Sequence, residues 1–182
     1  MNKEIKLNLG CGRSHKKGYI NVDVSSEVKP DKIWDLEKVP LPFKDNSISE
    51  IVIEHAIEHV RNFIPLMHDL RRICENSAKI EIKVPFYTGH NQFMDPTHVR
   101  FFTPFTFDYF KKGAFSHEVN CKEDMFEVEK VKINFGFGRS SKLNFIINPL
   151  INFNHLLYCR FFAWILPSAE IYYRLKVIKS NC

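Results

Sequence analysis

The chain has 182 residues, of which 45% are hydrophobic and 26% are charged, a composition that is typical of one globular domain with a sizeable core. We therefore expect a single domain over residues 1–182. Its five cysteines, at 11, 74, 121, 159 and 182, form no close pair, which excludes a zinc ribbon and a disulfide framework and favours reduced thiols in the cytoplasm. The opening MNKEIKLNLG has no basic start followed by a long apolar run, so no secretory signal is expected.

The net charge of +5 comes entirely from the C-terminal part of the chain. Residues 1–138 contain equal numbers of acidic and basic residues, whereas residues 139–182 contain six basic residues and one acid, Glu170. This asymmetry predicts an acidic partner or a membrane surface for the C-terminal segment. The remainder is neutral and has no basic stripe interleaved with aromatic residues, so nucleic acid is disfavoured as a partner.

Hydrophobic periodicity predicts strands that alternate with helices. The strands are expected over residues 5–9, 19–24, 32–34, 48–54, 78–84, 125–135 and 170–179, and the helices over 62–74 and 103–112, the second with Thr103 as its N-cap. Prolines make residues 39–43 a connecting loop, and residues 86–100 form a polar loop. This order indicates an α/β fold, a Rossmann-like doubly wound and mostly parallel sheet with helices on both faces.

A glycine-rich loop follows the first predicted strand. The sequence LNLGCG places Gly10 and Gly12 around Cys11, and two such glycines let the backbone approach a ligand closely. Asp23 ends the second strand, where a carboxylate can accept both hydroxyls of a ribose. Asp35 follows the third strand, where its carboxylate suits an adenine amino group. Ligands of doubly wound sheets bind at such strand ends.

A nicotinamide-binding site is the first alternative for this loop. That site requires a third glycine, a position that His15 occupies here, and an acid about 20 residues further on. Asp23 follows Gly10 after only 13 residues. The spacing therefore disfavours a dinucleotide, while a Gly-x-Gly by itself is also compatible with a simple tight turn.

The segments LNLGCG, GYINVDVS and WDLEKVPLPFKDNSISEIVIEHAIEHV resemble successive motifs of the class I S-adenosylmethionine (SAM)-dependent methyltransferases, and most of all the small predicted methyltransferases associated with cell-surface glycan synthesis. DPTHVRFFTPFTFDYF is similar to their substrate-side segment, so the resemblance covers residues 5–135. It implies SAM as cofactor, with a cofactor-binding half over residues 1–85 and a substrate side over 86–182. The short segment 13–18 departs from the family pattern, because it cannot contain a full crossover helix.

The resemblance also implies a set of cofactor-binding residues. Gly10 and Gly12 border the methionine part, Asp23 binds the ribose, and Asp35 and Leu36 flank the adenine. The complete set that we expect is Leu9, Gly10, Cys11, Gly12, Asp23, Val24, Asp35, Leu36, Glu54 and His55. The acceptor implied by the likeness is a hydroxyl of a glycan, a glycolipid or a small molecule. A non-catalytic SAM- or nucleotide-binding module is an alternative.

Three histidines are candidates for catalysis. His55 follows a strand end and is expected to face the methyl group, where an imidazole can take a proton from a hydroxyl; His59 and, on the substrate-side loop, His98 are the others. His55, Glu58 and His59 also match the H-x-x-E-H pattern of a class of zinc peptidases. The pattern directly follows a strand and no third ligand is evident, so we expect no metal and keep a zinc hydrolase only as an alternative.

Residues 143–166 contain 17 apolar residues. Their length could span a bilayer, but interspersed asparagines and Arg160 make a span costly. Asn144, Asn148, Asn152 and His155 fall on one helical stripe, so the segment is expected to be amphipathic. It either packs on the sheet or forms an interfacial helix, in which case residues 139–182 contact the cytoplasmic face of a membrane. The sequence leaves the oligomeric state open.

Overall fold

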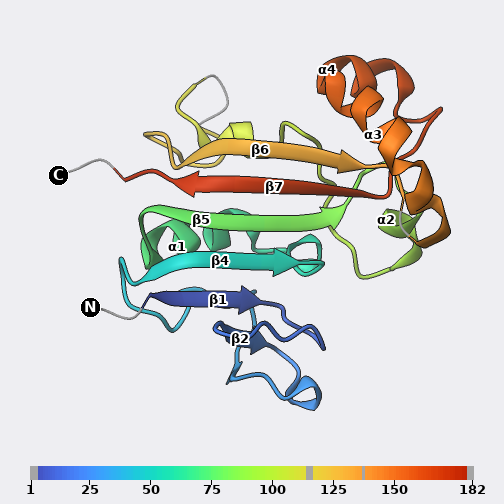
Figure 1. Cartoon of the computed structure of the whole chain (residues 1–182). Helices are drawn as coiled ribbons and strands as arrows, with labels where there is room; N and C mark the ends of the chain where they lie inside the picture. The colour runs from blue at the N-terminus through green and yellow to red at the C-terminus, as the bar shows by residue number, and fades with distance from the viewer. Residues whose placement is uncertain (1–3, 114–116, 137, 180–182) are drawn as a thin grey trace.

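A computed structural model describes residues 4–113, 117–136 and 138–179, without the side chains of residues 139 and 140. Seven strands form one sheet in the order β3-β2-β1-β4-β5-β7-β6 (Figure 1). Their bounds are β1 Ile5–Leu9, β2 Ile20–Asp23, β3 Lys32–Ile33, β4 Ile48–Glu54, β5 Cys74–Pro85, β6 Phe126–Asn134 and β7 Glu170–Val177. Strands β1 to β5 are parallel, and β7 is antiparallel to both β5 and β6. This arrangement confirms the predicted doubly wound, mostly parallel fold.

Helix α1 (Phe63–Ile73) is the main helix packed on the sheet. Its side chains Leu66, Met67 and Leu70 are fully buried, because apolar residues at a spacing of three to four fall on one helical face. Arg71 and Arg72 lie in its last turn, where the helix dipole favours cations. The predicted helix over 62–74 is therefore confirmed.

Two elements on the substrate side differ from the predictions. Residues 86–100 contain a short helix, α2 (His90–Met94), that the polar composition did not reveal. The predicted helix over 103–112 is shorter than expected, because only Thr106–Phe110 is helical and it is a 3₁₀ helix. Thr103 does cap the turn that leads into it: its hydroxyl accepts from the amide of Phe105 over 3.3 Å, and its own amide donates to the Thr106 hydroxyl over 2.9 Å.

The mostly parallel sheet is as predicted, but the predicted helices on both faces are not formed throughout, because the described helices leave much of one face open (Figure 1). Figure 1 shows α1 behind the sheet, while the face toward the viewer has no described helix across β1, β4, β5 and β7. Only residues 10–19 connect β1 to β2, too short a connection for a crossover helix. Ion pairs join neighbouring strands of the sheet: Lys6–Glu50 at 2.8 Å, Glu81–Arg174 at 3.0 Å and Glu127–Lys176 at 3.2 Å.

The C-terminal segment forms α3 (Asn144–Phe153), α4 (His155–Leu157) and one wider helical turn, Tyr158–Phe162. The predicted asparagine stripe packs on the free edge of β6. Asn152 accepts from the amide of Ile133 over 2.7 Å and donates to its carbonyl over 2.8 Å. Further along the same edge, Asn148 accepts from the amide of Phe135 and Asn144 accepts from the amide of Gly136. The side chains thus replace the backbone partners that an edge strand lacks.

The opposite side of this segment is apolar and exposed. Its exposed residues are Leu143, Phe145, Ile146, Leu150, Phe153, Leu156, Leu157, Phe161, Phe162, Trp164 and Ile165. We call these residues the apolar surface. In the described part of the chain, no helix has the length and hydropathy needed to cross a bilayer. The segment is therefore amphipathic with its polar stripe turned toward the protein.

Four cysteines, Cys11, Cys74, Cys121 and Cys159, have free thiols. Burial raises the pKa of the Cys74 thiol to about 12, so this group stays protonated and unreactive at neutral pH. Cys182 lies outside the described residues, and the expectation of a reduced thiol there stays a prediction.

Candidate functional site

A cavity of about 320 Å³ opens at the carboxyl ends of the parallel strands. We call it the cofactor cavity. The residues that line it are Gly10, Gly12, Asp23, Val24, Trp34, Asp35, Leu36, Glu37, His55, Ala56, His59 and Val60. Seven of the expected cofactor residues belong to this lining, because β1, β2, β3 and β4 all end at the same edge of the sheet.

The glycine loop forms the floor of the cofactor cavity. Gly10 has a φ of +66°, and a Cβ placed on it would stand 2.2 Å from the Cβ of Ala56. Gly12 has a φ of +49° with open space around its Cα. A side chain at position 10 is therefore excluded by both conformation and contact, whereas at position 12 only the backbone conformation favours glycine. We call this narrow turn, packed on Ala56 at Gly10 and open at Gly12, the glycine cradle.

Asp23 and Asp35 contribute carboxylates to the wall of this cavity. Asp23 Oδ2 accepts from the amide of Gly12 over 2.8 Å, and Oδ1 accepts from the amide of Ser25 over 2.9 Å. Asp35 Oδ1 accepts from the amide of Glu37 over 3.0 Å. A carboxylate has about four acceptor positions, so each of these side chains retains acceptor capacity toward the cavity.

Three expected cofactor residues do not line the cavity. The side chain of Leu9 is fully buried in the core, and the buried Cys11 uses its amide to bond the Val22 carbonyl over 3.0 Å. Glu54 pairs with Lys16 at 3.3 Å. Sequence reasoning in turn missed Trp34, Glu37 and Val60. The carboxylate of Glu37 accepts from the amides of Arg61 and Asn62 at the start of α1, a role that no local pattern revealed.

His55 occupies the end of β4 in a left-handed conformation, with a φ of 52°. Such a backbone is uncommon for a residue with a side chain and is often found at functional sites. Its Nε2 lies 2.9 Å from Glu170 Oε1, and its Nδ1 lies 3.5 Å from Glu58 Oε1. Lys83 Nζ contacts the same Glu170 oxygen at 3.2 Å. The network therefore joins the ends of β4, β5 and β7.

These contacts raise the pKa of the His55 imidazole to about 9, chiefly through the bond to Glu170 and next through Glu58. Burial opposes the effect but is weaker. At neutral pH the imidazole accordingly carries its second proton and donates toward both carboxylates. In this state His55 orients acidic partners and does not accept a proton.

Glu58, His59 and His98 form a compact cluster next to the cofactor cavity. One potential ligand atom from each residue lies within 4.8 Å of those of the other two. The ring centroids of His59 and His98 are 4.7 Å apart, and His98 Nε2 is 3.9 Å from Glu58 Oε1. The side chain of Glu58 is fully buried, and neither of its carboxylate oxygens has a hydrogen-bond partner among the described residues.

A second cavity, of about 570 Å³, adjoins this cluster, and we call it the acceptor cavity. Its lining consists of His55, Glu58, His59, Pro85, Asn91, Met94, Asp95, Pro96 and His98. His55 and His59 line both cavities. The three candidate catalytic histidines are thus brought together at the boundary between the two spaces.

The zinc-peptidase arrangement of His55, Glu58 and His59 is not formed. That arrangement requires a helix that carries both histidines on one face. Here His55 is left-handed and only Ile57–His59 form a short 3₁₀ helix. His55 is bonded to Glu170 instead, and His98, from a loop about 40 residues away in sequence, takes the third position of the cluster.

Solved structures share this fold. A SAM dependent methyltransferase from Archaeoglobus fulgidus has a TM-score of 0.61 at 19% identity, covering 96% of this chain and 86% of that chain. The [4+2]-cyclase SpnF has a TM-score of 0.58 at 10% identity, covering 99% and 77%. An S-adenosylmethionine dependent methyltransferase from Mesorhizobium loti has a TM-score of 0.56 at 12% identity, covering 96% and 91%.

No protein-family model and no curated protein matches the sequence. The structural likenesses, at 10% to 19% identity, establish a common fold. The same fold is found in two enzymes described as methyltransferases and in one described as a cyclase, so activity has to be argued from the site. The chain has the seven-stranded, Rossmann-like α/β fold of these structures.

Proposed function

We propose that this chain binds SAM in the cofactor cavity and transfers its methyl group to a hydroxyl of a glycan, a glycolipid or a small molecule. The observation that carries the proposal is the cofactor cavity itself, with a glycine cradle at its floor and two acidic strand ends in its wall. The fold shared with solved methyltransferases supports it.

The described residues fit each part of SAM. The contact of Gly10 with Ala56 holds the loop in its turn, and the open space around Gly12 leaves the backbone accessible to the methionine part. Asp23 retains acceptor positions for ribose hydroxyls, and Asp35 retains them for the adenine amino group. Leu36 and Val60 supply apolar surface for the ring. The amide of Gly12 is fixed by Asp23, which joins the loop to the ribose position.

When bound, SAM supplies a methyl group on a sulfonium: the hydroxyl oxygen bonds to the methyl carbon, the carbon–sulfur bond breaks with its electron pair going to sulfur, and the hydroxyl proton leaves. The protein must align the acceptor with that methyl and receive the proton. His55, His59 and His98 line the acceptor cavity. We propose that the protonated His55 helps to align the acceptor and that His59 or His98 receives the proton.

Calorimetry with SAM and with its demethylated product tests the cofactor assignment. We expect binding in one-to-one stoichiometry, and a loss of about tenfold in affinity for Asp23→Asn and for Asp35→Asn, since a weakened charged hydrogen bond is worth about 1.4 kcal/mol. Asp108→Asn, at an exposed position that does not line the cavity, should leave the affinity unchanged. A wild-type chain that binds neither compound contradicts the proposal.

A non-catalytic binding module is the second candidate, and the short connection between β1 and β2 favours it, because this part of the site is enclosed by fewer residues. Labelled methyl transfer to a panel of glycans, glycolipids and phenols separates the two functions. Transfer to any hydroxyl in the panel supports the methyltransferase. Firm SAM binding with no transfer to any acceptor class supports the module.

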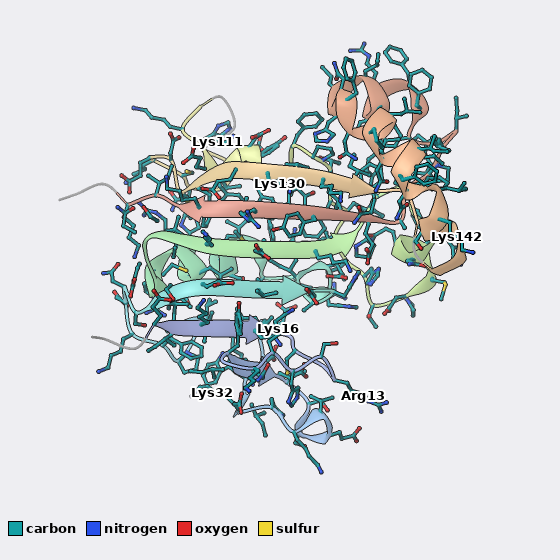
Figure 2. All side chains as sticks on the ribbon, viewed as in Figure 1. Arg13, Lys16, Lys32, Lys111, Lys130 and Lys142 are labelled. Atoms are coloured by element: carbon teal, nitrogen blue, oxygen red, sulfur yellow. The ribbon has the colours of Figure 1, made fainter. Side chains whose placement is uncertain are left out.

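We also propose that the apolar surface docks on an anionic membrane and so brings the acceptor cavity to lipid-linked substrates. Phe153 is 88% exposed, Ile165 78% and Trp164 68%, and water does not favour such a continuous apolar patch. Residues 136–169 contain no acid. Lys142 precedes α3 (Figure 2), and Arg160 lies within the segment. Apolar anchors with basic neighbours suit the interface of an anionic bilayer.

Flotation with vesicles of phosphatidylglycerol tests this docking. The chain should float with these vesicles, less so at 0.5 M salt and hardly with phosphatidylcholine alone. The double variant Phe153→Ser, Trp164→Ser should stay at the bottom, whereas Ile33→Ser should float, because Ile33 is 57% exposed but lies on β3, at the other edge of the sheet. A wild-type chain that does not float, or that dimerises through these residues, contradicts the proposal.

A further inference from the structure

The buried carboxylate of Glu58 has no satisfied hydrogen bond. Its side chain is 0% exposed, and both oxygens lack a hydrogen-bond partner among the described residues. The nearest nitrogens, His55 Nδ1 and His98 Nε2, lie 3.5 Å and 3.9 Å from Oε1. The charge of the protonated His55 offsets only part of the cost of burying this carboxylate without a hydrogen bond, so the structure calls for a further group that completes it.

We infer that Glu58, His59 and His98 bind a divalent first-row transition-metal ion at the boundary between the cofactor cavity and the acceptor cavity. Two imidazoles and one carboxylate form a donor set that suits Zn²⁺, Mn²⁺ or Co²⁺ better than Mg²⁺ or Ca²⁺, which prefer oxygen ligands. Their ligand atoms lie within 4.8 Å of one another. Around an ion at about 2.1 Å such atoms stand about 3.0–3.5 Å apart, so binding requires small rotations of both the His59 and the His98 side chains that contract the set.

Hydrogen bonds hold the His98 imidazole in the form that a metal requires. Its Nδ1 lies 3.0 Å from the carbonyl oxygen of Gln92. A carbonyl can only accept, so Nδ1 carries the hydrogen and Nε2, the nitrogen toward Glu58, has a free lone pair in the neutral ring. A backbone carbonyl on the outer nitrogen is the usual outer contact of a metal-binding histidine.

A chain of two hydrogen bonds also determines which nitrogen of His59 carries the hydrogen. The Thr97 hydroxyl donates to Asp95 Oδ1 over 2.6 Å, and since it has one hydrogen it can only accept from His59 Nδ1, which lies 2.8 Å away. Nδ1 therefore carries the hydrogen, and Nε2 is left as the free nitrogen. In both histidines a hydrogen bond therefore fixes Nδ1 as the protonated nitrogen and leaves Nε2 available for a metal ion. A chance cluster of side chains would not need this arrangement.

The place of the cluster gives the ion a role, which rests on the function proposed above. Glu58, His59 and His98 all line the acceptor cavity, and His59 lines the cofactor cavity as well. Three protein ligands leave coordination positions open toward the cavity, as in catalytic metal sites. An acceptor hydroxyl on such a position loses its proton more readily, so with the ion bound the proton passes to water, and His59 and His98 act as ligands and not as bases. We therefore expect the ion to bind and orient the acceptor oxygen.

The sequence pattern alone does not reveal this site. It suggests His55 with Glu58 and His59, the set that the structure does not form. The third ligand, His98, comes from the loop after α2, and its proximity depends on that loop folding back over the 3₁₀ helix, where the amide of Val99 donates to the Glu58 carbonyl over 3.0 Å.

The test uses the full chain, stripped with a chelator and titrated with Zn²⁺ or Co²⁺ alone, with Mg²⁺ and Ca²⁺ as comparison ions. We expect one ion per chain, a visible Co²⁺ spectrum, and a thermal midpoint that rises with the ion. Glu58→Gln and His98→Ala should each weaken binding by at least about 100-fold, and Thr97→Val by about tenfold. His117→Ala removes an exposed histidine elsewhere and should change nothing.

Glu58→Gln also has a metal-free readout. Without the ion it should unfold at a temperature no lower than the wild type, because it removes a buried charge, yet it should no longer respond to Zn²⁺. Binding of Zn²⁺ that is equal in the wild type, Glu58→Gln and His98→Ala overturns the site, as does no binding at all. A chain that binds SAM but no ion overturns this inference and leaves the proposed function intact. A chain that binds the ion but not SAM supports the metal site and contradicts the proposed function.

Discussion

Gly10 and Ala56 lie so close together that a Cβ on Gly10 would stand 2.2 Å from the Ala56 Cβ. The contact joins the loop after β1 to the residue that follows the left-handed His55 after β4. The floor of the cofactor cavity and the position of His55 therefore depend on the same van der Waals contact.

Gly10→Ala should destabilise the chain and weaken SAM binding together. The added methyl meets Ala56 and the backbone has a positive φ, so we expect a cost of about 2–4 kcal/mol in unfolding free energy. Gly12→Ala is the matched control: it has the positive φ without the contact and should cost only about 1 kcal/mol. Urea denaturation measures both. Equal costs would show that the Ala56 contact is unimportant.

His98→Ala should separate turnover from cofactor binding. His98 lines the acceptor cavity and does not line the cofactor cavity. We therefore expect kcat to fall at least about 100-fold while the Kd for SAM stays within about twofold. Steady-state kinetics with an identified acceptor and calorimetry with SAM provide the two numbers. An unchanged kcat removes His98 from the site.

Asn152→Leu should weaken the attachment of α3 to β6. It leaves the amide and carbonyl of Ile133 without partners, which costs about 1–3 kcal/mol for each buried group. Leu150→Asn, on the opposite and 69% exposed side of the same helix, should cost less than about 0.5 kcal/mol. Hydrogen exchange at the Ile133 amide provides a local readout. Protection there that is unaffected by Asn152→Leu contradicts the assigned contact.

The open face of the sheet should contribute a pH-dependent part of the stability. Glu50 accepts from Lys6 over 2.8 Å and from Tyr19 over 2.5 Å. Burial is the largest influence and opposes them, but together these partners lower the pKa of the carboxyl below its ordinary value. Because the pKa of Glu50 is lower in the folded chain than in the unfolded chain, its contribution to stability is complete above the pKa of the unfolded chain. This contribution is lost as the pH falls through the pKa of the folded chain.

Glu50→Gln should therefore be less stable than the wild type by up to about 1 kcal/mol at pH 7, and the difference should shrink as the pH is lowered from about 4.5 toward 3. Glu129→Gln, an exposed glutamate on β6, should match the wild type at every pH. A difference between wild type and Glu50→Gln that grows on acidification contradicts the assignment.

Much of the fold is predictable because its signals are local. β1 alternates and is followed directly by the glycine loop, and β4 has a β-branched centre and ends at Glu54, so both strands match their predicted bounds. Residues 103–112 match only in part: the capping hydrogen bonds of Thr103 and Thr106 form as the local pattern indicates, but the turns that follow are 3₁₀ and end at Phe110.

The site is less predictable, since it depends on contacts between distant segments. The glycine loop, Asp23 and Asp35 come from short motifs, and the structure does bring them to one cavity. The contact of Glu37 with the Arg61 amide joins residues 24 positions apart in the sequence. The pairing of His55 with Glu170 joins residues 115 positions apart. No periodicity or motif spacing contains that information, because it arises only from the order of strands in the sheet.

The sheet that remains open on one face also affects how the protein responds to temperature. Rows of charged side chains on that face are hydrated before unfolding, so less apolar surface becomes newly exposed when the chain unfolds. A chain of 182 residues ordinarily has a heat-capacity increment of about 2.2–2.7 kcal/mol/K, and this one should fall below that range. The free energy of unfolding should therefore change little with temperature, so the protein with this half-covered sheet keeps nearly constant stability over a wide span of temperatures.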